Sequence, residues 1–144
     1  MDSSRLPTDG ESWMRWVEQQ LRILNRHTHQ AVGSSDPPPP AWTNPTLQNG
    51  WVNFLAGTVP VGYRLVGDVV QVRGTIKSGT LAKAVFTLPS GFRPAAGSVY
   101  FVGLAGAGAA RIDIEWTGAV TVRSYFSSGS NSMVSLSGIS FSIT

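Results

Sequence analysis

Two carboxylates, two residues apart, come nearest to a catalytic pair in this sequence. Asp113 and Glu115 lie in a segment whose polar and apolar residues alternate. On a strand both side chains lie on one face, about 7 Å apart at Cα, and glycosidases use two carboxylates to cleave a glycosidic bond. Their neighbours Ile112, Ile114 and Trp116 fall on the opposite face, which is typical of an ordinary strand with a solvated polar side. We therefore expect no catalytic residue here.

The histidines His27 and His29 are the candidate metal ligands. Three chains that meet on a threefold axis could bind a metal ion through such a pair. On a helix, however, residues i and i+2 do not share a face, which favours a role at the helix end, where a cation interacts well with the helix dipole. The sequence assigns no metal site, and metal binding by these two histidines stays open.

The rest of the chain is poor in catalytic groups. It has no cysteine, and both histidines precede residue 30, so a later serine has no nearby imidazole in the sequence to act as its base. Residues 106–111, Gly-Ala-Gly-Ala-Ala-Arg, begin like a dinucleotide fingerprint but place arginine where the third glycine belongs. We expect a flexible loop there, no cofactor and no enzymatic activity. The absence of cysteine suits assembly in a reducing cytoplasm.

Aromatic residues beside small polar ones form the candidate binding surface. Tyr125 and Phe126 precede the loop Ser-Ser-Gly-Ser-Asn-Ser at residues 127–132, which includes Asn131. An exposed aromatic ring can stack on a sugar ring, and neutral polar groups can bind its hydroxyls. We predict a glycan contact at Tyr125, Phe126 and Asn131.

Charge is scarce and unevenly distributed. Charged residues make up 13% of the chain, about half of the usual 25%. Residues 1–40 carry four basic and five acidic side chains, a net charge of −1, whereas residues 41–144 carry seven basic and three acidic ones, a net charge of +4. Because the seven cations are scattered, we expect no nucleic-acid binding. Because no run of about 18 apolar residues occurs, we expect no membrane insertion.

The N-terminal residues predict a helix that needs a partner. Thr8 and Glu11 fit a capping box. An apolar seam with heptad spacing follows at Met14, Val17, Leu21 and Leu24. A lone helix of about 20 residues is marginal in water, so the seam should pack either on the rest of the chain or on the same helix of sister chains. We favour sister chains, because the next segment holds the helix away.

Residues 33–41 predict a stiff linker. Gly-Ser-Ser-Asp at 33–36 is followed by four prolines at 37–40, which favour an extended polyproline segment. A proline run can also be a ligand for an SH3 domain, but this one has no flanking basic residue. We therefore predict three parts: a helix at 1–32 for docking and oligomerisation, the linker, and a head domain at 42–144.

From Trp42 onward the period of the pattern changes to two, with short segments broken by glycine. The predicted strands are 51–55, 61–66, 70–77, 84–88, 99–104, 111–116, 119–125 and 133–143. In the last of them the apolar parity changes near Gly138, which indicates a bulge. About eight short strands favour a mainly β fold, an antiparallel, jelly-roll-like sandwich, here preceded by a short helix.

Several stretches of the β part share a recognisable pattern. It consists of an opening Trp51, a long central strand entered through Gly67-Asp68, a Leu-Pro-x-Gly-aromatic-Arg-Pro turn at 88–94, and a closing strand. The stretches are 47–51, 63–76, 86–94, 111–115 and 134–141. This pattern resembles the C-terminal head domains of bacteriophage tail-fibre and minor tail proteins, which bind receptors.

The resemblance implies a non-enzymatic virion protein, assembled in the host cytoplasm. Such a short tail fibre or minor tail protein would form a homotrimer, present its β head for host-surface attachment, and join other virion proteins through residues 1–40. Fibre proteins usually carry a long shaft, whereas here residues 1–40 must serve as shaft and attachment region together. A capsid or tail decoration protein without a dedicated receptor therefore stays an alternative.

Overall fold

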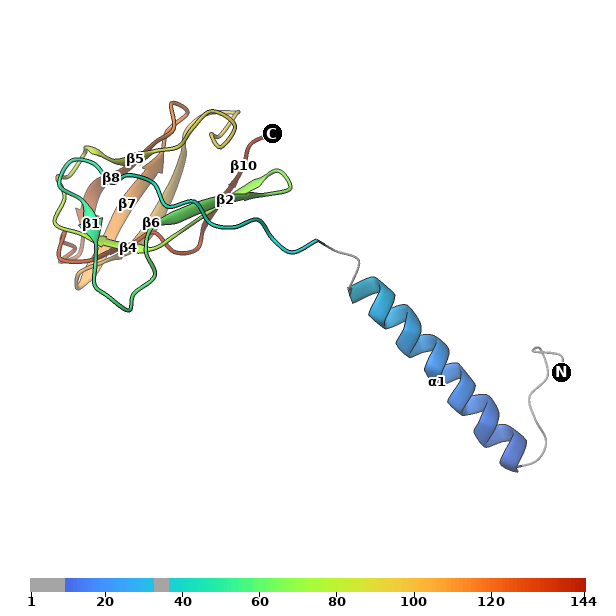
Figure 1. Cartoon of the computed structure of the whole chain (residues 1–144). Coiled ribbons are helices and arrows are strands. Elements are labelled where there is room, and N and C mark those ends of the chain that lie inside the picture. Colours follow the sequence, from blue (N-terminus) through green and yellow to red (C-terminus); the bar gives the residue numbers. More distant parts are fainter. Residues whose placement is uncertain (1–9, 33–36) are drawn as a thin grey trace. The chain divides into compact units, whose positions relative to one another are not determined.

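The computed structural model describes residues 10–32 and 37–144. The chain divides into two compact units, and the boundary along the chain falls between Pro39 and Pro40. The first unit contains helix α1 (Gly10–Val32), and the second contains the strands β1 to β10 (Figure 1). In the described part of the chain no helix has both the length and the apolarity of a membrane-spanning segment.

Helix α1 leaves part of its predicted seam open to solvent. Met14 and Leu21 are 59% and 54% exposed, and Val17 is half-buried. Trp13 and Trp16 stack on one another, with ring centroids 5.5 Å apart. The side chain of Leu24, and Thr8 of the predicted capping box, lie outside the described residues.

The larger sheet of the head has seven strands, all paired antiparallel. In spatial order they are β1 (Val52–Asn53), β4 (Thr75–Lys77), β9 (Val134–Ser135), β6 (Val99–Ala105), β7 (Gly108–Ile114), β8 (Ala119–Phe126) and β5 (Ala84–Thr87). The pairs β6–β7 and β7–β8 are hairpins between consecutive long strands. They form the broad part of this sheet.

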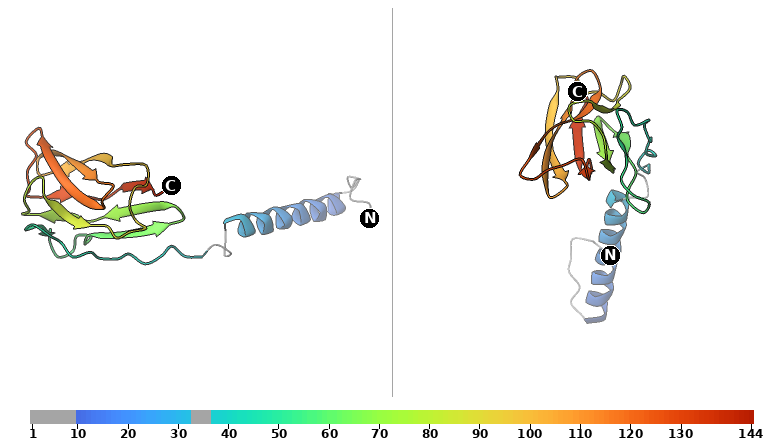
Figure 2. Two further views of the ribbon diagram at one scale, coloured as in Figure 1. Left: turned by 90° about the horizontal axis from the view of Figure 1, so that it is seen from above. Right: turned by 90° about the vertical axis from the view of Figure 1, so that its left-hand side faces the viewer.

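The smaller sheet has three antiparallel strands. In order they are β10 (Ile139–Ser142), β3 (Val69–Arg73) and β2 (Gly62–Val66). The predicted turn at Gly67-Asp68 joins β2 to β3, with Gly67 at a φ of 63°. In the right-hand view of Figure 2 the orange strands of the larger sheet lie on one side of the head and the green strands β2 and β3 on the other.

The core lies between the two sheets, as expected for a sandwich. Its largest side chains include Trp51, Phe86, Ile112 and Leu136, each at most 2% exposed. Gly79 lies against the indole of Trp51 so closely that a Cβ at this position would overlap the ring. The predicted antiparallel β-sandwich with a preceding helix is therefore confirmed as the fold.

Two of the predicted strands are wrong in the same way, because each is divided between the sheets. The segment 70–77 breaks at Gly74, whose φ of 116° turns the chain from β3 into β4. The segment 133–143 does not contain a bulge near Gly138 but splits into β9 and β10, with Gly138 at a φ of 89°. Glycine tolerates these left-handed conformations, and they redirect the strand.

The expected flexible loop at 106–111 is also corrected. Gly106, with a φ of 55°, belongs to a tight turn, and β7 begins at Gly108. Ala105 pairs with Gly108, and Leu104 pairs with Ala109. The small residues therefore form a hairpin.

Candidate functional site

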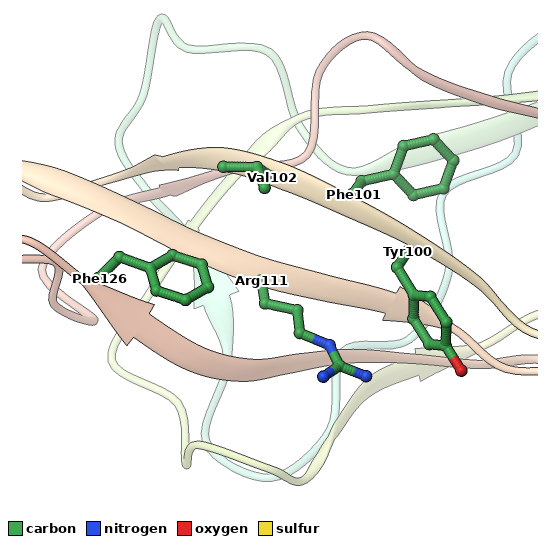
Figure 3. Close-up of a pocket in the computed structure, with 5 residues that line it drawn as sticks. All are labelled: Tyr100, Phe101, Val102, Arg111 and Phe126. Atoms are coloured by element: carbon green, nitrogen blue, oxygen red, sulfur yellow. The ribbon is translucent and has the colours of Figure 1, made fainter.

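The hairpins of β6, β7 and β8 place several unusual side chains on the outer face of the larger sheet. Because Val102 pairs with Arg111 and Tyr100 pairs with Asp113, these four side chains share one face. Phe126 joins them through its pairing with Ala109. A shallow groove of about 410 Å³ runs over this face (Figure 3). We call it the β6–β8 groove; its lining residues are Tyr100, Phe101, Val102, Arg111 and Phe126.

A network of ion pairs borders the β6–β8 groove. Arg111 donates to both carboxylate oxygens of Asp113, Nε to Oδ1 at 2.7 Å and Nη2 to Oδ2 at 3.2 Å. Arg123 donates from Nε to Oδ2 of Asp113 at 3.1 Å and from Nη2 to Oε1 of Glu115 at 2.7 Å. A register shift between β7 and β8 at Arg111/Ile112 leaves Arg123 as an extra residue in β8. A bulge of this kind redirects a side chain.

The prediction that Asp113 lies on a solvated face is wrong. Asp113 is only 3% exposed, because Arg111 and Arg123 cover its carboxylate. The hydrogen bond to Asp113 raises the pKa of Arg111 above its ordinary value. Both oxygens of Asp113, and one oxygen of Glu115, are occupied by guanidinium groups. The two carboxylates thus hold neighbouring strands together.

The β6–β8 groove has the chemistry of a binding surface. Its walls are mainly aromatic and aliphatic, and Arg111 lies over the ring of Tyr100, with its guanidinium carbon 4.6 Å from the ring centroid. Among the residues that the structure describes, no three His, Cys, Asp or Glu side chains are grouped as metal ligands would be. The side chains of His27 and His29 lie outside the described residues.

The three residues predicted to contact a glycan have different surroundings. Phe126 is exposed and lines the groove. Tyr125 packs against the core, and its buried hydroxyl has no hydrogen-bond partner; burial raises the pKa of this hydroxyl. Asn131 donates from Nδ2 to the backbone carbonyl of Gly79 at 3.1 Å, and the backbone carbonyl of Asn131 accepts a hydrogen bond from the N–H of Ser78 at 2.8 Å. The glycan contact stays a prediction, in which Phe126 offers the exposed ring.

The loop 127–132 is held in a defined conformation beside Phe126. Ser127 and Ser128 have φ values of 44° and 60°, and the hydroxyls of Ser130 and Ser132 are 2.8 Å apart. Gly129 lies close to the carbonyl of Ala109. The hydroxyl groups of this loop follow Phe126 directly in the chain, and their role beside that ring stays a prediction.

A second cluster, which the sequence did not reveal, joins the end of the linker to the smaller sheet. The guanidinium carbons of Arg64 and Arg73 each lie 4.2 Å from the ring centroid of Trp42. Arg64 also donates to Oε1 of Gln71 at 2.7 Å, and Thr43 exchanges two backbone hydrogen bonds of 2.9 Å with Tyr63. These contacts fix the chain directly after the prolines onto the head. From the sequence alone, Arg64 and Arg73 are two of several scattered cations, and nothing indicates that they share one aromatic ring.

Comparison with known proteins identifies the fold. No protein-family profile and no curated protein matches the chain. Among solved structures, the receptor binding protein (gp15) of Listeria phage PSA is similar, with a TM-score of 0.56 and 18% sequence identity. The match covers 94% of this chain and 80% of that one. The predicted resemblance to phage receptor-binding heads is thereby confirmed at the level of the fold.

Proposed function

We propose that this chain is a bacteriophage virion protein, a short tail fibre or minor tail protein that presents its β head for attachment to the host surface. The single observation that carries this proposal is the similarity of fold to a phage receptor binding protein over 94% of the chain. The chemistry of the head agrees, because its Asp113 and Glu115 carboxylates are engaged in ion pairs and its β6–β8 groove is lined mainly by apolar side chains. The protein is assembled into the virion in the host cytoplasm.

The proposed assembly is a homotrimer formed through α1 and the β head. Met14 and Leu21 expose apolar surface, which a seam of sister helices would bury. Val17 and Leu24 complete the heptad spacing of this seam. Residues 1–40 also carry the contact to other virion proteins.

The proposed host contact is a surface glycan bound where β8 enters the loop 127–132. Phe126 supplies the exposed ring, and Asn131 and the serine hydroxyls supply neutral polar groups. Tyr125 anchors the end of the strand in the core and so positions Phe126. Neutral groups around one ring suit an uncharged sugar.

Deletion of the gene tests the proposed function. We expect intact particles that no longer adsorb to the host, with adsorption restored by the gene in trans. Fragile particles that adsorb normally would contradict the proposal and would support a capsid or tail decoration protein instead. Heating the particles and counting those that retain DNA measures fragility separately from adsorption.

A further inference from the structure

Two arginines on the outer face of the smaller sheet have no carboxylate partner. The guanidinium carbons of Arg64 in β2 and Arg73 in β3 each lie 4.2 Å from the ring centroid of Trp42. The two carbons are therefore no further apart than twice this distance. Within residues 37–144 the ion pairs all lie on the larger sheet. Two like charges thus converge on one ring, and none of the described residues supplies an opposite charge.

The pairing of β2 with β3 brings the two arginines to the same ring. Arg73 pairs with Gly62, which lies two residues before Arg64 and on the same face of the sheet. A Cβ at Gly62 would lie 3.4 Å from Cβ of Trp42 and 3.5 Å from Nε of Arg73. The absence of a side chain at Gly62 therefore leaves room for the ring and the guanidinium group to meet above β2.

Arg73 has hydrogen-bonding capacity that the described protein does not use. Its Nε is buried and has no hydrogen-bond partner among the described residues. Arg64, by contrast, donates from Nε to Oε1 of Gln71 at 2.7 Å. Because arginine is not deprotonated in proteins, both groups stay cationic. An unpaired guanidinium donor beside a second positive charge indicates an anionic ligand.

A hollow of about 290 Å³ opens beside Arg73 on this face. Its lining includes Trp42, Gln71, Arg73 and Ser140, whereas Arg64 lies outside the lining. Gln71 pairs with Ser140 across β3 and β10, so the amide and the hydroxyl share the face of Arg73. Small-molecule sites begin at about 300 Å³. The hollow therefore suits a small ligand that accepts several hydrogen bonds.

The charge of this cluster favours a phosphate group over a carboxylate or a neutral sugar. The ring of Trp42 is already engaged by two guanidinium groups, so it is a poor stacking surface for a sugar. A carboxylate carries one negative charge, whereas a phosphate monoester carries about 1.5 to 2 at pH 7. Only the phosphate balances both arginines, and the guanidinium fork matches its oxygens.

We propose that this hollow, which we call the Trp42 site, binds a phosphate group with two negative charges. Arg73 donates hydrogen bonds to the phosphate oxygens, and Arg64 supplies the second positive charge from outside the lining. Gln71 and Ser140 supply neutral hydrogen-bonding groups. The phosphate is either a free ion or the terminal group of a larger molecule. This inference does not rest on the proposed host attachment, whose glycan contact involves Phe126 on the larger sheet.

Calorimetric titration of the full chain with inorganic phosphate, at constant ionic strength, tests the Trp42 site. Phosphate should bind at least about tenfold more tightly than acetate, and Arg73→Gln should weaken phosphate binding at least about tenfold, because charge-assisted hydrogen bonds are lost. Arg64→Gln should weaken it less. Arg93→Gln is the matched control: Arg93 donates to the carbonyl of Leu88, and its loss removes one positive charge elsewhere in the head, so phosphate binding should not change.

A wild-type chain that binds phosphate no more tightly than acetate would overturn the proposal. Equal weakening by Arg73→Gln and Arg93→Gln would overturn it too, since it would show a response to net charge by an adventitious ion only. If Arg73→Gln does not fold, Arg73→Lys replaces it; the lysine keeps the charge but lacks the planar fork, so phosphate binding should still weaken.

Two further ligands identify the source of the phosphate. Glucose 6-phosphate that binds more tightly than inorganic phosphate supports the terminal group of a larger molecule, whereas weaker binding supports a free ion. Poly-glutamate that binds more tightly than both, and only when Arg73 is present, would show that the site takes an acidic protein segment, and the proposal would be wrong.

Discussion

At the scale of single residues, Asp113 organises the outer face of the larger sheet. One buried carboxylate receives three hydrogen bonds from Arg111 and Arg123, which come from adjacent strands. The guanidinium groups stay partly hydrated, because the side chains of Arg111 and Arg123 are 43% and 37% exposed. Asp113 thus acts as a structural residue that sets the position of Arg111 in the β6–β8 groove.

The substitution Asp113→Asn should lower the free energy of unfolding by about 1 to 3 kcal/mol, because two guanidinium groups lose their shared charged partner. Glu115→Gln is the matched control and should cost less than about 1 kcal/mol, since exposed ion pairs contribute little. Chemical denaturation of both variants measures the difference. Equal losses of unfolding free energy in the two variants would contradict the larger structural role of Asp113.

The hydroxyl of Tyr125 should make the stability of the head depend on pH in the alkaline range. Burial raises the pKa of its hydroxyl in the folded head, so above about pH 10 the unfolded chain ionises first and stability falls as pH rises through the folded pKa. Tyr125→Phe should make this fall shallower. At pH 7 it should leave stability unchanged or raise it by up to about 1 kcal/mol, because the hydroxyl lacks a partner.

Thermal or denaturant unfolding between pH 7 and 11 checks both effects, with the exposed Tyr100→Phe as the matched control. A loss of more than about 1 kcal/mol in Tyr125→Phe at pH 7 would show that the hydroxyl is hydrogen-bonded in solution and would contradict its assigned environment.

At the scale of elements, α1 and β6 each present apolar side chains that one chain leaves exposed. Leu21 of α1 and Val102 of β6 are examples from the two units. The cluster of Trp42 with Arg64 and Arg73 fixes the chain after the prolines to the head.

Leu21→Lys should dissociate the proposed helix assembly, because it places like charges at a seam position of every chain and removes about 2 kcal/mol of apolar burial from each. Gln19→Lys, an exposed position off the heptad seam, is the control and should leave the assembly intact. Sedimentation equilibrium measures the mass of each variant. If Leu21→Lys retains the parental mass, assembly through α1 is contradicted.

Sequence patterns predicted those features that depend on neighbours along the chain. The alternation at Ile112 and Ile114 correctly predicted a strand, and Gly67-Asp68 correctly predicted the turn between β2 and β3. The division of 133–143 between two sheets was missed, because a parity change at Gly138 looks the same for a bulge and for a crossover. The burial of Asp113 was missed as well, since it depends on the register of β7 against β8, which the sequence does not display.

The candidate site was predictable in the same limited way. Phe126 beside a serine-rich loop could be read from adjacent residues, whereas its neighbours in the groove, Tyr100 and Arg111, come from other strands. Solvated charges and ion-paired charges have the same alternating pattern in a sequence, so only the cross-strand register distinguished them.

At the scale of the whole molecule, the chain consists of a helix, a short linker and a sandwich head, for which we propose assembly through the helix and host recognition by the head. The proposed attachment of the virion to its host by the head agrees with the low content of charged residues, 13% of the chain, because apolar, hydroxyl and aromatic surfaces would then carry the contacts.

Competition for adsorption tests this claim most directly. The purified full chain, added to host cells before the phage that encodes it, should reduce adsorption in a saturable manner. Phe126→Ala should weaken this inhibition at least about tenfold, as loss of a central aromatic contact does, whereas the exposed but distant Trp116→Ala should not. A full chain that neither binds host cells nor reduces adsorption at any concentration would contradict the account.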